Sequence, residues 1–150
     1  MAADLTTTVT ESVVLNGALR GNTNSVTTTG INNVFERIVT CIHSNVTTVA
    51  VFDTAPFTSA GAIDVENVRY VRVTNLDEDG SLDLAVVTTT SSYTVLLTPG
   101  NSHILCLGEE VAVGEVGAPS FPTLSDLASL QISPVGAVYS PQVAVFVASI

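Results

Sequence analysis

The stretch "NVRYVRVTNLDEDGSLDLAVVTT" (residues 67–89) decides the fold class, because apolar and polar side chains alternate on both sides of an acidic turn. In its first half, Val71 and Val73 fall on one face, and Tyr70 and Arg72 fall on the other. In its second half, the apolar residues again share one face: Leu82, Leu84 and Val86. A two-residue period is typical of a half-buried β-strand. The stretch therefore predicts two strands that each turn one face toward a core.

The acidic turn between these strands begins like a calcium-binding loop, since Asn75 opens the pattern Asn-x-Asp-x-Asp-Gly. A calcium-binding helix–loop–helix unit needs flanking helices and a glutamate at the twelfth loop position, which here is Val86. We therefore predict the solvated tip of a β-hairpin, in which Gly80 supplies a positive φ. Asp77 and Asp79 remain weak candidates for a divalent cation, and we predict no metal site.

Runs rich in β-branched and other apolar residues, typical of strands, occupy much of the remaining chain: residues 36–44, 45–53, 91–98, 102–108 and 136–150. Turn residues separate them at short intervals, as in the dipeptide Asn16-Gly17. We predict an all-β fold, an antiparallel β-sandwich or a jelly-roll-like barrel, with an extended N-terminal arm. The segment "SDLASLQI" (125–132) alone has a helical pattern, because Leu127 and Leu130 are three residues apart. It predicts a short helix of one or two turns.

The length of 150 residues fits one domain with a sizeable core. We expect residues 31–150 to form a single β-sandwich domain. Residues 1–30 are rich in Thr, Asn and Gly, and we expect them to form an arm or hairpin of the same domain that reaches a neighbour. The apolar side chains of this segment are the candidate interaction residues: Leu5, Val9, Val13, Val14 and Leu15.

Charged residues are scarce, at 12% of the chain, and 14 carboxylates against four arginines give a net charge of −10. Solvated surfaces are commonly ~25–35% charged, and a folded monomer of this mass exposes roughly 7,000 Å². Because 46% of the residues are apolar, two explanations remain. Either Thr, Ser and Asn cover the exterior, or much of the exterior is buried against other subunits. We expect the second.

The negative charge also argues against several kinds of partner. Phosphate backbones and anionic lipid surfaces both repel such a chain, so we predict no nucleic-acid partner and no membrane partner. There is no run of 18 apolar residues, which predicts no membrane span. The first residues lack the basic and apolar regions of a secretory signal, so we expect none.

Two Cys–His pairs contain the ligand types of a structural zinc site: Cys41 with His43, and His103 with Cys106. An odd separation places His103 and Cys106 on opposite faces of a strand, so we predict no zinc site. A disulfide between the two cysteines stays open.

Signals of catalysis are weak. Asp53, Asp64 and Glu66 could supply paired carboxylates for sugar hydrolysis, but the chain has no Trp and only three Tyr to stack sugars. An acid–base enzyme would need a pocket that holds His43 or His103 beside a carboxylate. We predict no enzymatic activity and no cofactor.

Three segments carry a resemblance to a known group of proteins: "VENVRYVRVTNLDEDGSLDLAVV", "YTVLLTPGNSHILCLG" and "QVAVFVAS". With the strand "VRVTNLD", the following "LTPGNSHIL" and the closing "VAS", they resemble small all-β virion proteins of marine tailed bacteriophages. The resemblance covers most of residues 60–150. It implies a structural role in a virus particle assembled in the host cytoplasm, and it assigns no chemical role to any residue.

Composition and resemblance together predict a non-enzymatic virion structural protein. The first expectation is a capsid decoration (cement or knob) protein that associates with copies of itself, a trimer being preferred, and contacts other capsid or tail proteins. The alternative is a β domain of a tail or fibre that acts as an adaptor or binds a host-surface ligand.

Overall fold

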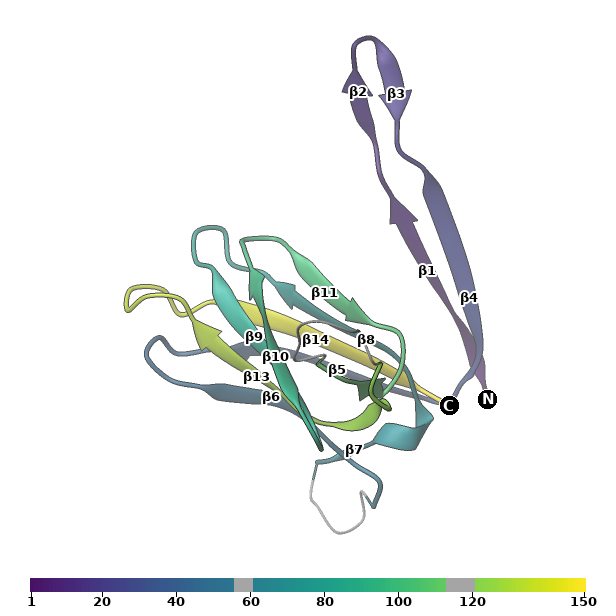
Figure 1. Ribbon diagram of the computed structural model, residues 1–150, viewed down its shortest axis with the longest axis vertical. Coiled ribbons are helices and arrows are strands. Elements are labelled where there is room, and N and C mark those ends of the chain that lie inside the picture. Colours follow the sequence, from purple (N-terminus) through teal and green to yellow (C-terminus); the bar gives the residue numbers. More distant parts are fainter. Residues whose placement is uncertain (56–60, 113–120) are drawn as a thin grey trace.

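The computed structural model describes residues 1–55, 61–112 and 121–150, and β-strands form most of this part of the chain (Figure 1). The helical segment within these ranges is the short 3-10 helix η2 (Val65–Asn67). Within them, no helix combines the length and the hydropathy that a membrane crossing requires. The predicted all-β class is confirmed.

Two sheets pack face to face as a sandwich. The first sheet has the order β10-β9-β13-β6-β7, with β12 beside β13. Its strands are β6 (Thr47–Asp53), β7 (Ile63–Asp64), β9 (Leu82–Thr88), β10 (Ser92–Leu97), β12 (Glu109–Glu110) and β13 (Ser125–Pro134). The second sheet has the order β11-β8-β14-β5. Its strands are β5 (Asn33–Thr40), β8 (Val68–Asn75), β11 (Ser102–Leu105) and β14 (Gln142–Ser149). Neighbours pair antiparallel except β6 and β7, which run parallel.

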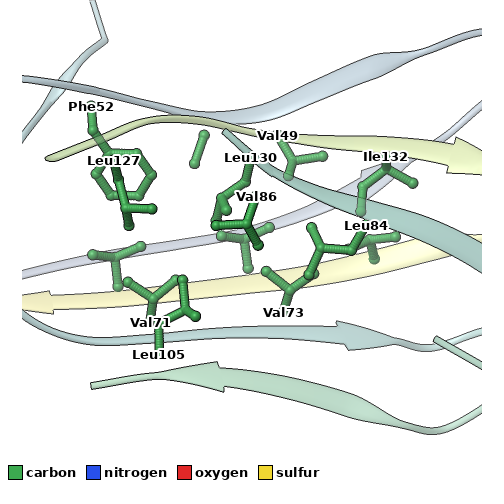
Figure 2. Packing of buried hydrophobic residues seen from close by; sticks show 14 of the residues in the cluster. Val49, Phe52, Val71, Val73, Leu84, Val86, Leu105, Leu127, Leu130 and Ile132 are labelled. Carbon is green, nitrogen blue, oxygen red and sulfur yellow. The ribbon is translucent and has the colours of Figure 1, made fainter. Parts of the chain in front are cut away.

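The core lies between the two sheets (Figure 2). Leu84 on β9 and Leu130 on β13 face Val71 and Val73 on β8, and each of these side chains is 1% exposed or less. Strand β14 adds three more fully buried side chains: Val143, Val145 and Val147. Each such burial stabilises the fold by about 1.5–3 kcal/mol. The alternation predicted for residues 67–89 is therefore confirmed.

The expected short helix at residues 125–132 is wrong, because this segment is the long strand β13, which pairs with both β9 and β6. The pairing register shifts between Leu127 and Ser129. Such a bulge adds one residue to the strand, so Leu127 and Leu130 both turn inward although they are three residues apart. A bulged strand thus imitates the spacing of a helix.

The acidic stretch is not a hairpin tip, which corrects a second expectation. Strand β8 before it and strand β9 after it belong to different sheets, so residues 76–81 cross from one layer to the other. Gly80 does not have the positive φ expected of it. A glycine fits there because a Cβ would lie 2.8 Å from the Cβ of Tyr139.

Asn75, a fully buried polar residue, holds this crossing in place. Its side-chain amide donates to the backbone oxygens of Gly80 (2.8 Å) and Leu97 (3.1 Å). Its Oδ1 accepts from the backbone N–H of Asp77 (3.0 Å). Since Leu97 ends β10, one side chain ties the β8–β9 connection to the β10–β11 connection.

Candidate interaction surface: the N-terminal arm and the groove beside it

Residues 3–31 form a long β-hairpin, here called the arm, which projects from the sandwich (Figure 1). Four strands build it: β1 (Ala3–Thr10), β2 (Val13–Leu15), β3 (Ala18–Arg20) and β4 (Thr23–Ile31). Within the described chain, β1 pairs only with β4 and β2 only with β3. An isolated two-stranded hairpin is marginally stable in water, so the arm lacks the second layer that strands normally need.

Two special backbone positions shape the arm. At the tip, Asn16 and Gly17 have φ values of 52° and 76°, as a two-residue hairpin turn requires and as the Asn-Gly dipeptide predicts. Further down, Gly21 has a φ of +113°, and a Cβ there would overlap the backbone oxygen of Glu11. Only glycine fits this second position without moving the opposite strand.

One face of the arm is covered by hydroxyl groups. Three pairs contact each other across the strands: Thr6 with Thr27 (3.4 Å), Thr8 with Ser25 (2.8 Å) and Thr10 with Thr23 (3.3 Å). Cross-strand pairs of this kind each contribute roughly 0.2–1 kcal/mol. Apart from Asp4, which the same alternation places on this side, the face is polar and uncharged.

The other face, here called the apolar face, carries aliphatic side chains among polar ones such as Asn24 and Thr28. On it, Leu5, Thr7 and Val9 alternate with the hydroxyl face, and Val26 lies opposite Thr7. Of the five predicted interaction residues, Leu5 is half-buried, and the other four are exposed: Val9 (49%), Val13 (57%), Val14 (69%) and Leu15 (59%).

Sequence reasoning missed two apolar side chains of the arm. Leu19 is 72% exposed and Val26 is 55% exposed. The signal that could have found them is the Asn16-Gly17 turn. Counting outward from this turn pairs Leu19 with Val14, and it pairs Val26 with Thr7.

At its base, the arm borders an open groove of ≈ 310 Å³ on the outer face of the second sheet. Residues from the arm and from strands β5, β8 and β14 line it: Leu5, Thr6, Thr7, Thr8, Glu36, Tyr70, Arg72 and Phe146. The junction itself is ordered, because Ile31 is buried and the Asn32 N–H donates to the Ser149 oxygen (2.9 Å).

An aromatic pair and a guanidinium form the sheet side of this groove. The rings of Tyr70 and Phe146 meet edge to face with their centroids 6.0 Å apart. The guanidinium carbon of Arg72 lies 5.7 Å from the Phe146 centroid. Arg72 Nε is buried and has no hydrogen-bond partner within the described ranges. The groove therefore offers an apolar surface beside a cation with unused hydrogen-bonding capacity.

The outer face of the second sheet stays apolar beyond the groove. Ile38 on β5 is 64% exposed, Val34 on the same strand is 49% exposed, and Ile104 on β11 is 40% exposed. On the outer face of the first sheet, the exposed apolar residues Val51 and Leu96 lie on β6 and β10, with strands β9 and β13 between them.

The two weak metal candidates lie in the loop that crosses between the sheets. Asp77 Oδ1 accepts from the backbone N–H groups of Asp79 (2.8 Å) and Gly80 (2.7 Å). These bonds, first the one from Gly80, hold the pKa of the Asp77 carboxyl below its usual range. In the part of the chain that the structure describes, no three His, Cys, Asp or Glu side chains are arranged to hold a metal ion. Asp77 thus has a structural use in the loop.

The Cys–His pairs are not brought together into such a group either. Cys41 is buried and Cys106 is exposed, and both are free thiols, so no disulfide joins them. Burial raises the pKa of the Cys41 thiol, which keeps it protonated and unreactive. His43 contacts its neighbour Ser44 at 3.3 Å.

His103 belongs to a different cluster, which the sequence did not predict. It lies on β11 with its ring centroid 6.2 Å from that of Tyr93 on β10. Burial, together with the charge of Glu110 and a hydrogen bond to it, raises the pKa of Tyr93 to about 12. Burial lowers the pKa of His103 against a smaller opposing effect of Glu110. His103 thus lies near the carboxylate of Glu110, as an acid–base enzyme would require. The tyrosine of the same cluster, Tyr93, has a pKa of about 12, too high for it to serve as a general acid or base near neutral pH.

The carboxylates considered for sugar hydrolysis are largely engaged locally. Asp53 and Asp64 lie opposite each other on the parallel pair β6–β7. Asp53 Oδ1 accepts from the Ala55 N–H (3.0 Å), and Asp64 Oδ2 accepts from the Asn67 amide (2.8 Å). Glu66 is exposed on η2.

Charge is divided unevenly between the arm and the sandwich. The arm contains Asp4, Glu11 and Arg20, for a net charge of −1, so the rest of the chain carries −9 of the total −10. Contacts between copies that involve the arm therefore meet less repulsion than contacts between two sandwiches.

No protein-family model, no curated protein and no solved structure matches the chain.

Proposed function

We propose that this chain is a non-enzymatic virion structural protein. Specifically, it is a capsid decoration (cement or knob) protein that associates with copies of itself, a trimer being preferred. It contacts other capsid or tail proteins and stabilises the shell through the summed area of these contacts. The observation that carries the proposal is the uncovered arm, and the resemblance to phage virion proteins supplies the setting.

The surface area supports burial against partners. A compact monomer of this mass exposes roughly 7,000 Å² by the usual scaling, whereas this chain exposes 8967 Å². The excess of roughly 2,000 Å² per chain is comparable to the ~1,600 Å² that a standard protein–protein interface buries in total. An arm with exposed Val14 and Leu19 is the part that most needs such a partner.

The experiment that tests this proposal measures self-association and placement in the particle. Sedimentation and light scattering of the full chain should show a stable oligomer. Val13→Asn and Leu15→Asn, two exposed arm positions, should weaken it. Leu96→Asn is the matched control, because Leu96 is also exposed (57%) but lies on the first sheet. A chain that stays monomeric at every concentration and that imaging does not find on a virion would overturn the proposal.

One observation favours the alternative of a tail or fibre domain that binds a host-surface ligand. The groove beside the arm combines the rings of Tyr70 and Phe146 with Arg72 and several hydroxyls, groups that suit a sugar. Binding on a glycan array that disappears in Phe146→Ala would support this alternative, and a blank array would remove it.

A further inference from the structure

The outer face of the second sheet and the apolar face of the arm match each other in chemistry. On the sheet, exposed Ile38 and half-buried Phe146 form an apolar surface with one acid, Glu36, and one base, Arg72. The arm's apolar face likewise combines exposed aliphatic side chains with one acid and one base near its tip. The acid of each surface can therefore meet the base of the other, with apolar side chains in contact around them.

The charges on the sheet are placed by strand register. Phe146 on β14 lies opposite Glu36 on β5 and opposite Arg72 on β8. Glu36 and Arg72 therefore flank Phe146 on the same face, two strand spacings apart, or about 10 Å between their Cα atoms.

The charges on the arm are placed in the same way. Val13 lies opposite Arg20, and the Glu11 N–H donates to the Asn22 oxygen (2.9 Å). Val13 and Arg20 share one side of the hairpin. Glu11 lies between β1 and β2, two residues before Val13, and the same two-residue count places it on that side. Glu11 and Arg20 are diagonal neighbours, about 7–8 Å apart. The separations on the two surfaces agree within the reach of long side chains.

We propose that the arm tip of one copy docks on the outer face of the second sheet of another copy. Arg20 of one copy pairs with Glu36 of the other, Glu11 pairs with Arg72, and Val13 and Leu15 cover the apolar surface around Phe146. This inference rests on the proposed self-association and names the two surfaces that meet in it.

Three observations favour a second copy over an unrelated partner. Both members of each charge pair are present on this chain, so the match needs no other protein. Two sandwiches that each carry −9 repel each other, while the arm at −1 bridges them with little repulsion. The excess surface of roughly 2,000 Å² per chain also matches what a stable interface between copies buries.

Charge reversal on the full chain tests the pairing. Glu36, Arg20 and Glu66 are all exposed, so the fold should tolerate the changes, and the melting temperature checks this. R20E and E36R should each raise the dissociation constant of the oligomer by about tenfold or more, as expected for a close interfacial charge pair. The double variant R20E/E36R restores the pair in reversed order and should return the constant to within about threefold of wild type.

The matched control is R20E/E66R, which has the same net charge as R20E/E36R. In this control, Glu36 remains and faces a second acid at position 20, so the pair is not restored. It should associate as weakly as R20E. If R20E/E36R is no tighter than R20E/E66R, the pairing is wrong. An oligomer that none of these variants weakens overturns this inference but leaves the proposed function standing. A wild-type chain that is monomeric at every concentration overturns this inference, and it overturns the proposed function as well if imaging does not find the chain on a virion.

Discussion

The arm and the sandwich use the same kinds of residue to different ends. In the sandwich, Leu84 and Leu130 are fully buried because two sheets face each other. In the arm, Leu19 and Val14 lie opposite each other on one hairpin and are 72% and 69% exposed. Strand propensity is therefore enough to shape a hairpin, but a second layer is needed to make it a stable core. Within the described chain, the arm is a two-stranded sheet without a second layer.

The largest effect should come from truncating the core while leaving the arm as it is. Leu130→Ala should lower the free energy of unfolding by about 2–5 kcal/mol, since it removes a fully buried side chain and leaves a cavity. Leu19→Ala should change it by less than about 0.5 kcal/mol at concentrations where the chain is monomeric. Denaturant titration of both variants measures the difference. Equal costs would mean that the arm is already covered within its own chain.

A somewhat smaller loss of stability should follow when the hydrogen bonds of Asn75, which link the β8–β9 and β10–β11 connections, are removed. Asn75→Ala leaves the backbone oxygens of Gly80 and Leu97 and the Asp77 N–H without their partners. Each buried group left unpaired costs about 1–3 kcal/mol, and part of this loop can reach water. We expect a loss of roughly 3 kcal/mol by thermal or denaturant unfolding. Thr74→Ala, on the outer face of the same strand, is the control and should cost far less.

A substitution at Gly21 should weaken the arm without changing the stability of the sandwich. Gly21→Ala places a Cβ against the backbone of Glu11. It also forces an alanine into a positive φ, which alanine disfavours. Amide hydrogen exchange along residues 3–31 should become faster, while the global unfolding free energy changes by less than about 0.5 kcal/mol. Gly17→Ala, at a position with open space around it, should disturb only the turn. Matching losses in arm and sandwich would show that the two fold as one unit.

The smallest effect concerns the edge of the sandwich at high pH. The folded pKa of Tyr93 is about 12, above the ordinary value of 10.0. A raised folded pKa means that the stabilisation is fully present below about pH 10 and is lost as the pH rises toward 12. Ultraviolet titration should show one tyrosine ionising near pH 12 rather than near the ordinary value of 10.0, and Glu110→Gln should bring that ionisation to a lower pH. Tyr93 ionising near pH 10 would contradict the described burial.

Local sequence pattern predicted the individual strands well, and it failed where contacts between layers decide the outcome. The alternation around Val71 and Leu84 was enough to assign two strands, because one buried face leaves a period of two. The same pattern could not tell that β8 and β9 belong to different sheets. The three-residue spacing of Leu127 and Leu130 led to the wrong prediction of a helix, because the bulge between them exists only in the paired strand. No local rule signals such a bulge.

The candidate surface was predicted only in part, for a similar reason. Leu5 and Val13 were found because apolar residues in a threonine-rich segment stand out. The groove was missed, since Glu36, Tyr70 and Phe146 come from three strands far apart in the sequence. Such a site is a product of sheet order. The partner role of these residues stays a prediction.

The arm is joined to the sandwich through a single residue, since β4 ends at Ile31 and β5 begins at Asn33. The hairpin from Asn32 to the Asn16-Gly17 turn is about 50 Å long, at ~3.3 Å per residue. By this geometry, a rotation of only ~10° at Asn32 moves the tip by about 9 Å. In the proposed assembly, small torsional adjustments at this one residue would let the arms of identical copies reach neighbours at different distances.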